Sequence, residues 1–321
     1  MSKTQFRNRV TEAIVLQNMI RVEKIDTFTG HRDCVYALEK SGEKHRFFSA
    51  AGDGFVVRWN LQKPDVGELI AKVEHSVYAL AYLPQENHLW IAENFEGIHV
   101  IDIETKQEIR SLKLAPTNYF DIQIYQTEAF VAGGDGVISV IDVESFSFRK
   151  HIKASEVSVR CLAINPVERE LAAGFSDNTI KIFDLQTLQL KQVIAAHSNS
   201  VFALKYSPDF NFLLSGSRDA RLKIWDVERN YALEEEIVAH TFAINNISYQ
   251  PDNQRFATCS MDKSVKIWDA ETFKLLKVID RARHAGHGTS VNKLLWTDYD
   301  NQIVSGSDDR TISVWKLYDE S

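Results

Sequence analysis

The chain repeats one short phrase about every 42 residues, and this repeat constrains the fold more than any other feature. The phrase alternates apolar and polar residues, and five of its seven copies end in aspartate. The copies lie at 56–60, 98–102, 138–142, 180–184, 222–226, 265–269 and 312–316. A fixed period of this length indicates a repeat architecture. A length of 321 residues would otherwise suggest two domains, but the repeat predicts a single array of seven units.

Each unit contains four short runs of alternating residues, as the unit at 197–238 illustrates. Its runs lie at 201–206, 212–216, 222–227 and 232–238, and Pro208 and Asp209 mark the first turn. Alternation with period two between turn residues is typical of antiparallel strands. The sequence therefore predicts an all-β fold built from four-stranded antiparallel sheets.

The two ends of the array complement each other. The last unit stops after Trp315, too early for a fourth strand, whereas residues 21–28 form an extra strand-like run before the first unit. We expect the N-terminal strand to pair with the last sheet and close a ring, which hides the sheet edges. The predicted boundaries are an N-terminal extension at 1–20, one domain at 21–317 and a tail at 318–321. Residues 1–20 could contain a short helix or a strand.

Four units share a histidine, a hydroxyl residue, an aspartate and a tryptophan at constant steps of 18, 4 and 6 residues. The sets are His31, Ser49, Asp53 and Trp59; His197, Ser215, Asp219 and Trp225; His240, Thr258, Asp262 and Trp268; and His287, Ser305, Asp309 and Trp315. Ser, His and Asp together could form a nucleophilic triad. A catalytic set is needed once, however, so four copies favour a structural hydrogen-bond network across each sheet.

These four-residue sets, each followed by Trp-Asp or a close variant, resemble the WD40 repeat family. The resemblance covers residues 21–317 and implies a seven-bladed β-propeller in which the sets are structural tetrads. The second unit has His75 but no full tetrad, and the third and fourth lack the histidine. We expect these three blades to be less rigid than the others.

The resemblance also implies a binding surface, the top face around the central channel. Family positions next to the first apolar residue of each inner strand fall on Tyr36, Tyr78, Phe120, Arg160, Phe202, Asn245 and Asn292, with Arg218 beside them. Four of these seven are aromatic, against 11% of the whole chain. Aromatic residues and arginine dominate binding hot spots. The expected partner is a protein or peptide with apolar side chains and an acidic group.

The composition argues against several other functions. The net charge of −7 disfavours nucleic acid and anionic membranes as partners. The first residues lack the apolar core of a signal peptide, and no apolar run is long enough to span a membrane. Three widely spaced cysteines suggest neither a disulfide framework nor a zinc site. We expect no metal, no cofactor and a cytoplasmic location.

The sequence therefore predicts a non-catalytic scaffold, either a monomer or a subunit of a hetero-complex. Two alternatives remain open. A structural subunit that uses its blade edges would expose apolar side chains on the outer strands. An enzyme with a site in the channel would bring carboxylates or histidines from outside the tetrads together there.

Overall fold

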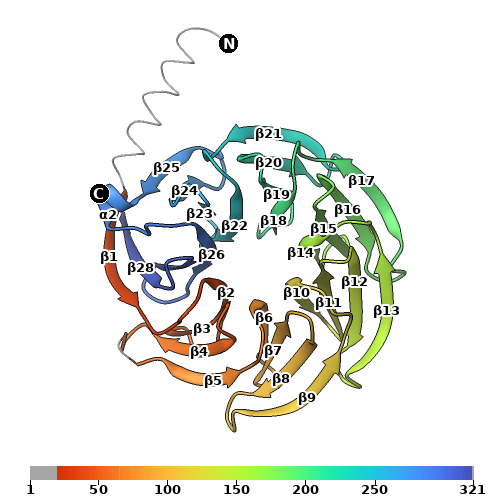
Figure 1. Ribbon diagram of the computed structural model, residues 1–321. Helices are drawn as coiled ribbons and strands as arrows, with labels where there is room; N and C mark the ends of the chain where they lie inside the picture. The colour runs from red at the N-terminus through yellow and green to blue at the C-terminus, as the bar shows by residue number, and fades with distance from the viewer. Residues whose placement is uncertain (1–19, 65, 320–321) are drawn as a thin grey trace, which may run out of the picture.

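Seven four-stranded antiparallel sheets surround a central channel in the computed structural model, which describes residues 20–64 and 66–319 (Figure 1). The first strand of each unit lies next to the channel and the fourth lies at the rim. The predicted all-β fold with seven blades is confirmed. In the described part of the chain, no helix is long and apolar enough to cross a bilayer.

Blades 1 to 4 each consist of four strands that are consecutive in the sequence. Blade 1 contains β2 (Val35–Lys40), β3 (Arg46–Ala51), β4 (Phe55–Asn60) and β5 (Glu68–Lys72). Blade 2 contains β6 (Val77–Leu83), β7 (His88–Glu93), β8 (Gly97–Asp102) and β9 (Gln107–Lys113). Blade 3 contains β10 (Tyr119–Tyr125), β11 (Glu128–Gly133), β12 (Val137–Asp142) and β13 (Ser147–Lys153). Blade 4 contains β14 (Val159–Asn165), β15 (Glu170–Phe175), β16 (Thr179–Asp184) and β17 (Leu190–Ala195).

Blades 5 to 7 follow the same plan, except that the last blade takes its outer strand from the start of the chain. Blade 5 contains β18 (Val201–Tyr206), β19 (Phe212–Ser217), β20 (Arg221–Asp226) and β21 (Ala232–Val238). Blade 6 contains β22 (Ile244–Tyr249), β23 (Arg255–Ser260), β24 (Val265–Asp269) and β25 (Leu275–Ile279). The short helix α2 (Arg281–His284) precedes blade 7, which contains β26 (Val291–Trp296), β27 (Gln302–Ser307), β28 (Ile312–Asp319) and β1 (Ile20–Phe28).

The ring closes through the pairing of β1 with β28. The register runs antiparallel from Ile20 opposite Asp319 to Phe28 opposite Ile312, so the predicted closure by the N-terminal strand is confirmed. Phe28 then extends the contact into blade 1, where its ring centre lies 5.9 Å from that of Phe47 and 5.4 Å from that of Trp59. The first and last described strands are thus held by strand pairing, which Figure 1 shows at β1 and β28. Aromatic packing adds to this pairing. Residues 1–19 lie outside the described residues.

The core lies between neighbouring blades. The second strands are almost wholly buried, and all six residues of β11 and of β15 are buried. Since blades pack on both faces of such a strand, its sequence reads as a continuous apolar run and not as an alternating one. Each interface therefore removes a large apolar area from water, at about 25 cal/mol per Å². This packing makes the ring a rigid support for its channel.

The turns between the second and third strands need backbone conformations with positive φ. Gly54 has φ +74°, and a Cβ at this position would collide with the carbonyl oxygen of Val73. Blade 2 forms this turn differently, with Phe95 at φ +68° and its side chain 46% exposed. A bulky residue rarely adopts this conformation, so the turn of blade 2 is locally strained.

Candidate functional site

A cavity of about 440 Å³ lies where the inner strands begin, at the top mouth of the channel. Seven of the eight residues that the sequence predicted for the top face line it: Tyr36, Tyr78, Phe120, Arg160, Phe202, Asn245 and Asn292. All seven are half-buried. Arg218 does not line the cavity but lies exposed in the loop between β19 and β20. The geometry therefore groups seven of the predicted residues and separates the eighth from them.

The aromatic residues and the arginine form one continuous stack across five blades. The Tyr36 and Tyr78 ring centres are 4.5 Å apart with a T-shaped geometry, and Tyr78 stacks on Phe120 at 5.8 Å. The Arg160 guanidinium carbon lies 3.7 Å from the centre of the Phe120 ring and 4.8 Å from that of the Phe202 ring. Edge-to-face and offset stacking, like cation–π contact, are favourable arrangements. The stack holds every member in place before any partner arrives.

The guanidinium of Arg160 has no polar partner in the described part of the chain. Its Nε is buried without a hydrogen bond, and no carboxylate lies within ion-pair distance. Burial lowers the pKa of Arg160, which still remains far above neutrality because an arginine does not deprotonate in proteins. With two rings lying close to the guanidinium, its terminal N–H groups are left to donate to a ligand.

The two tyrosine hydroxyls at the mouth stay protonated. Burial is the main cause that raises the pKa of Tyr36 and of Tyr78. A neutral phenol can donate a hydrogen bond as well as accept one. The mouth of the channel thus offers two neutral phenol groups in the same stack as the Arg160 cation.

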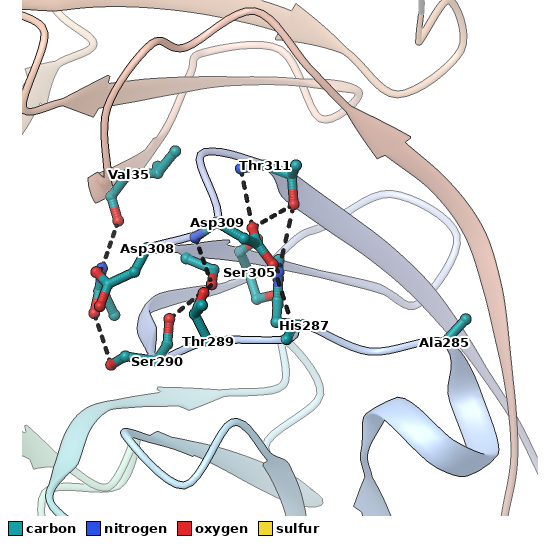
Figure 2. A network of polar contacts seen from close by, with 12 residues as sticks. Val35, Ala285, His287, Thr289, Ser290, Ser305, Asp308, Asp309 and Thr311 are labelled. Atoms are coloured by element: carbon teal, nitrogen blue, oxygen red, sulfur yellow. Dashed lines mark hydrogen bonds and ion pairs between the residues drawn. The ribbon is translucent and has the colours of Figure 1, made fainter.

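The two asparagines at the mouth play a different part, because they use their donors within the ring. Asn245 Nδ2 donates to Val291 O at 2.8 Å, which ties blade 6 to blade 7. Asn292 Nδ2 donates to Asp308 Oδ1 at 2.7 Å and to Val35 O at 3.1 Å, which ties blade 7 to blade 1. Figure 2 shows Val35, Asp308 and Ser290 gathered in this region. The geometry assigns these amides to the joining of blades.

A second cavity, of about 640 Å³, continues along the channel where the inner strands end. It shares Asp121, Leu204, Asn246 and Lys293 with the upper cavity and adds Glu39 and Lys205. The sequence analysis missed these charged residues. Glu39 and Asp121 line one cavity, which is the feature that the enzyme alternative predicts. The signal was a charged residue inside a mostly apolar inner strand, as in Val35–Lys40 and Val201–Tyr206.

The tetrads lie away from the channel and join the strands of single blades. The histidine Nε2 lies 2.7 to 2.8 Å from the hydroxyl oxygen in the pairs His31–Ser49, His197–Ser215, His240–Thr258 and His287–Ser305. The indole donates to the same hydroxyl at 2.7 to 2.9 Å in Trp59, Trp225 and Trp268. Each histidine Nδ1 faces the aspartate of its set, namely Asp53, Asp219, Asp262 or Asp309. The four hydroxyl residues are 0% exposed, so no substrate can reach them.

Blade 7 departs from this pattern at its tryptophan. Trp315 is buried, and its Nε1 has no hydrogen-bond partner within residues 20–64 and 66–319. Ser305 instead contacts only the histidine of its set, and Figure 2 shows His287 with Asp309 and Thr311 around it. The fourth tetrad therefore has the right residues but one fewer hydrogen bond.

Ionisation within the tetrads follows from burial and pairing. Burial lowers the pKa of His31 and of His240, although the facing aspartates oppose this shift. For Asp219, burial would raise the pKa, but hydrogen bonds from His197 and from the Ser198 N–H outweigh it and lower the pKa. The same balance lowers the pKa of Asp262 and Asp309. The networks thus hold ionised aspartates at neutral pH.

Blades 2 and 4 contain other polar networks in place of the tetrad. In blade 2, Glu93 is 3% exposed, accepts a 2.7 Å hydrogen bond from the His75 N–H and lies 2.8 Å from His99 Nε2. In blade 4, Asp177 accepts hydrogen bonds from Ser155 at 2.8 Å and from Lys181 at 3.1 Å. Losing the tetrad therefore does not leave these sheets without cross-strand polar ties.

Comparison with known protein families agrees with this geometry. Residues 101–315, about two thirds of the chain, match the model of the nucleolar protein 10-like N-terminal domain, a β-propeller. Residues 22–60 match the WD domain, G-beta repeat. No curated protein matches the chain.

One sequence-based expectation is wrong on these findings. The cytoplasmic location is contradicted, because the matched model describes a domain of a nucleolar protein. The resemblance to WD40 repeats is confirmed. The chain belongs to the nucleolar protein 10-like N-terminal β-propeller family and carries WD40 repeats.

Proposed function

We propose that this propeller is a non-catalytic interaction platform that binds a segment of a protein partner at the top mouth of its channel. The observation that carries the proposal is the unbroken stack from Tyr36 to Phe202 in a concave site. Aromatic side chains and arginine in a pocket are typical of binding hot spots. Since the ring already holds these side chains in place, little conformational entropy is lost when the partner binds.

Arg160 suggests the chemistry of the partner. A guanidinium without an ion pair in a half-buried site is electrostatically unsatisfied, and it binds a carboxylate best through two parallel hydrogen bonds. The protonated hydroxyls of Tyr36 and Tyr78, in the same stack, can donate to polar groups of the partner. The partner segment therefore combines apolar side chains, which contact the rings, with an acidic group.

The family match supports a nucleolar location for the protein, since the matched domain is named for a nucleolar protein. A fluorescent fusion expressed in the native cell, together with a nucleolar marker, tests this. An even distribution outside the marker would contradict it.

A second candidate function uses the rim of the ring. Apolar side chains are exposed on the outer strands, with Leu69 52%, Ile109 43%, Phe148 43%, Val193 51% and Leu233 47% exposed. The structural-subunit alternative predicts this feature. The two surfaces lie on different parts of the molecule, so they can be tested separately.

The test is affinity purification from the native cell with two matched triple variants. The top-face variant is Tyr36→Ala, Tyr78→Ala, Arg160→Ala, and the rim variant is Ile109→Ala, Phe148→Ala, Leu233→Ala. We expect the same partner to be captured by the wild type and the rim variant and to be lost with the top-face variant. Thermal unfolding must show both variants folded. If the rim variant loses the partner and the top-face variant still captures it, the top-face proposal is overturned and the second candidate is favoured.

A further inference from the structure

The wall of the channel carries cations that the overall charge of the chain does not suggest. The protein has a net charge of −7, yet Arg160, Lys293 and Lys205 line the two channel cavities. Within residues 20–64 and 66–319, none of the three forms an ion pair, whereas many surface lysines and arginines do. Burial lowers the pKa of Lys205, and the nearby carboxyl groups of Glu39 and Asp121 oppose this shift. Cations enclosed by protein walls without a direct ion pair form a local positive potential.

The two carboxylates in the channel offset only part of this potential. Asp121 accepts hydrogen bonds from the Ile122 and Leu162 N–H groups, both at 2.8 Å, and from Gln123 at 3.2 Å, and it can carry at most one negative charge against the three cations. Glu39 lies in the lower cavity, where burial raises its pKa to about 7. At neutral pH this carboxyl is therefore only partly ionised.

The three cations follow one another along the channel. Arg160 on β14 lines the upper cavity alone, Lys293 on β26 lines both cavities, and Lys205 on β18 lines the lower cavity alone. Cavities of about 440 and 640 Å³ have room for several side chains of a peptide. The positive groups are thus distributed along a path and not gathered at one point.

We propose that the channel binds successive carboxylates of one acidic peptide segment, the first at Arg160 and the next at Lys293 and Lys205. This inference rests on the proposed function, because it describes how the same partner segment continues inward from the aromatic stack. The three cations are single positive charges that follow one another along the channel. They therefore match the singly charged side chains of successive glutamate or aspartate residues.

The wall of the channel also favours entry of such a segment. Field lines from enclosed charges concentrate at the mouth, which raises the rate of encounter with an acidic chain and makes binding sensitive to salt. Arg160 can hold a carboxylate by two parallel bonds, whereas the lysines act as point charges that accept less exact geometry. The top of the channel would therefore set the position of the segment, and the lower part would add affinity.

The experiment measures fluorescence anisotropy of a labelled, C-terminally amidated hexaglutamate peptide with the full chain. Hexaglutamine of the same length is the uncharged control. The variants are Arg160→Gln, Lys293→Gln and Lys205→Gln, and the matched control is Lys150→Gln, which removes an exposed lysine without an ion pair on the rim strand β13. Thermal unfolding verifies that each variant is folded. Lys293→Gln and Lys205→Gln keep the test decisive if Arg160→Gln does not fold.

We expect hexaglutamate to bind, hexaglutamine not to bind, and each channel variant to lose about tenfold in affinity while Lys150→Gln loses little. Equal affinity of the channel variants and the Lys150→Gln control would overturn the proposal, as would no binding at all. Displacement by millimolar inorganic phosphate, or binding of an RNA oligonucleotide through the same three residues, would also overturn it. If the top-face triple variant loses the partner but hexaglutamate does not bind to the wild type, this inference fails while the proposed function stands.

Discussion

The guanidinium carbon of Arg160 lies 3.7 Å from the centre of the Phe120 ring, and the Phe202 ring lies near it at 4.8 Å. Three neighbouring blades supply these side chains, so the position of the cation depends on how blades 3, 4 and 5 pack. A planar cation in contact with two rings keeps its orientation. The edge of this cation is therefore preorganised for a carboxylate.

Arg160→Lys keeps the charge but removes the planar group that contacts both rings. We expect the affinity for hexaglutamate to fall about fivefold or more, because lysine cannot form the two parallel hydrogen bonds. Fluorescence anisotropy measures the change. The matched control is Arg218→Lys, in the exposed loop outside the cavity. An unchanged affinity in Arg160→Lys, or an equal loss with Arg218→Lys, would contradict a specific role for the stacked guanidinium of Arg160.

Trp225→Phe and Trp315→Phe compare the same position in two tetrads. Trp225 Nε1 donates to Ser215 Oγ at 2.8 Å, whereas Trp315 Nε1 has no partner in the described chain. Trp225→Phe removes a buried hydrogen bond and leaves part of a network unsatisfied, so we expect it to cost about 1 kcal/mol more free energy of unfolding than Trp315→Phe. Urea unfolding of both variants measures the difference. A larger cost for Trp315→Phe would contradict the assignment of the weaker tetrad to blade 7.

Phe28→Ala tests the closure of the ring. Phe28 is 2% exposed and packs on Phe47 and Trp59 of blade 1, so its loss leaves a cavity where the two ends of the chain meet. We expect a loss of about 3 to 4 kcal/mol in the free energy of unfolding. Ile25→Ala, on the same strand but 40% exposed, is the control and should cost less than about 1 kcal/mol. Similar losses in both variants would mean that strand pairing alone closes the ring.

Acid should destabilise the fold through the buried histidines. Burial lowers the pKa of His31 and of His240 below that in the unfolded chain, so the unfolded state takes up protons first. The contribution of each neutral buried histidine to the free energy of unfolding is complete above the unfolded pKa of about 6.5. It is lost as the pH falls through the folded pKa. Between pH 7.5 and 5.5 we expect a loss of up to about 1.4 kcal/mol per pH unit for each histidine.

Urea unfolding at a series of pH values measures this slope. His240→Asn should flatten it, because this variant cannot take up the proton. Asp219, Asp262 and Asp309 do not contribute in this range, since their pKa values are lowered below the ordinary value. A slope that is unchanged in His240→Asn would assign the effect to other groups.

Glu39 makes peptide binding depend on pH. Lys293, Lys205 and Asp121 face it from other strands and Lys40 from its own, and burial raises its pKa to about 7. As the pH falls from 8 to 6, Glu39 takes up a proton and the channel becomes more positive, so hexaglutamate should bind more tightly. The glutamates of the peptide stay ionised throughout this range. Glu39→Gln should remove most of the pH dependence, and an unchanged pH profile in that variant would contradict this assignment.

The pH dependence of stability has the opposite sign for Glu39 and for the histidines. The folded pKa of Glu39 is raised above its unfolded value, so its contribution is complete below the unfolded pKa and is lost as the pH rises through about 7. Unfolding of Glu39→Gln at pH 6 and pH 8 measures this contribution. The variant should gain stability relative to the wild type at pH 8.

The sequence by itself determined the number of blades, the four-stranded plan and the closure by residues 21–28. These features depend on local alternation and turn residues that recur at a fixed period, and such signals are readable along one chain. The list of residues at the mouth could be predicted for the same reason, because each occupies one repeated position. Tyr36, Phe120 and Arg160 thus line one cavity, as the repeat places them.

Only the tertiary structure decided what those residues do. Arg160 contacts two rings, while Asn245 and Asn292 donate hydrogen bonds to neighbouring blades, although the three occupy equivalent repeat positions. The channel charges Lys205 and Lys293 come from strands about 90 residues apart and line one cavity only because the ring closes. The repeat determines only where each side chain lies on its own strand. Their partners belong to other blades, and the distances between blades are set by packing across the whole ring.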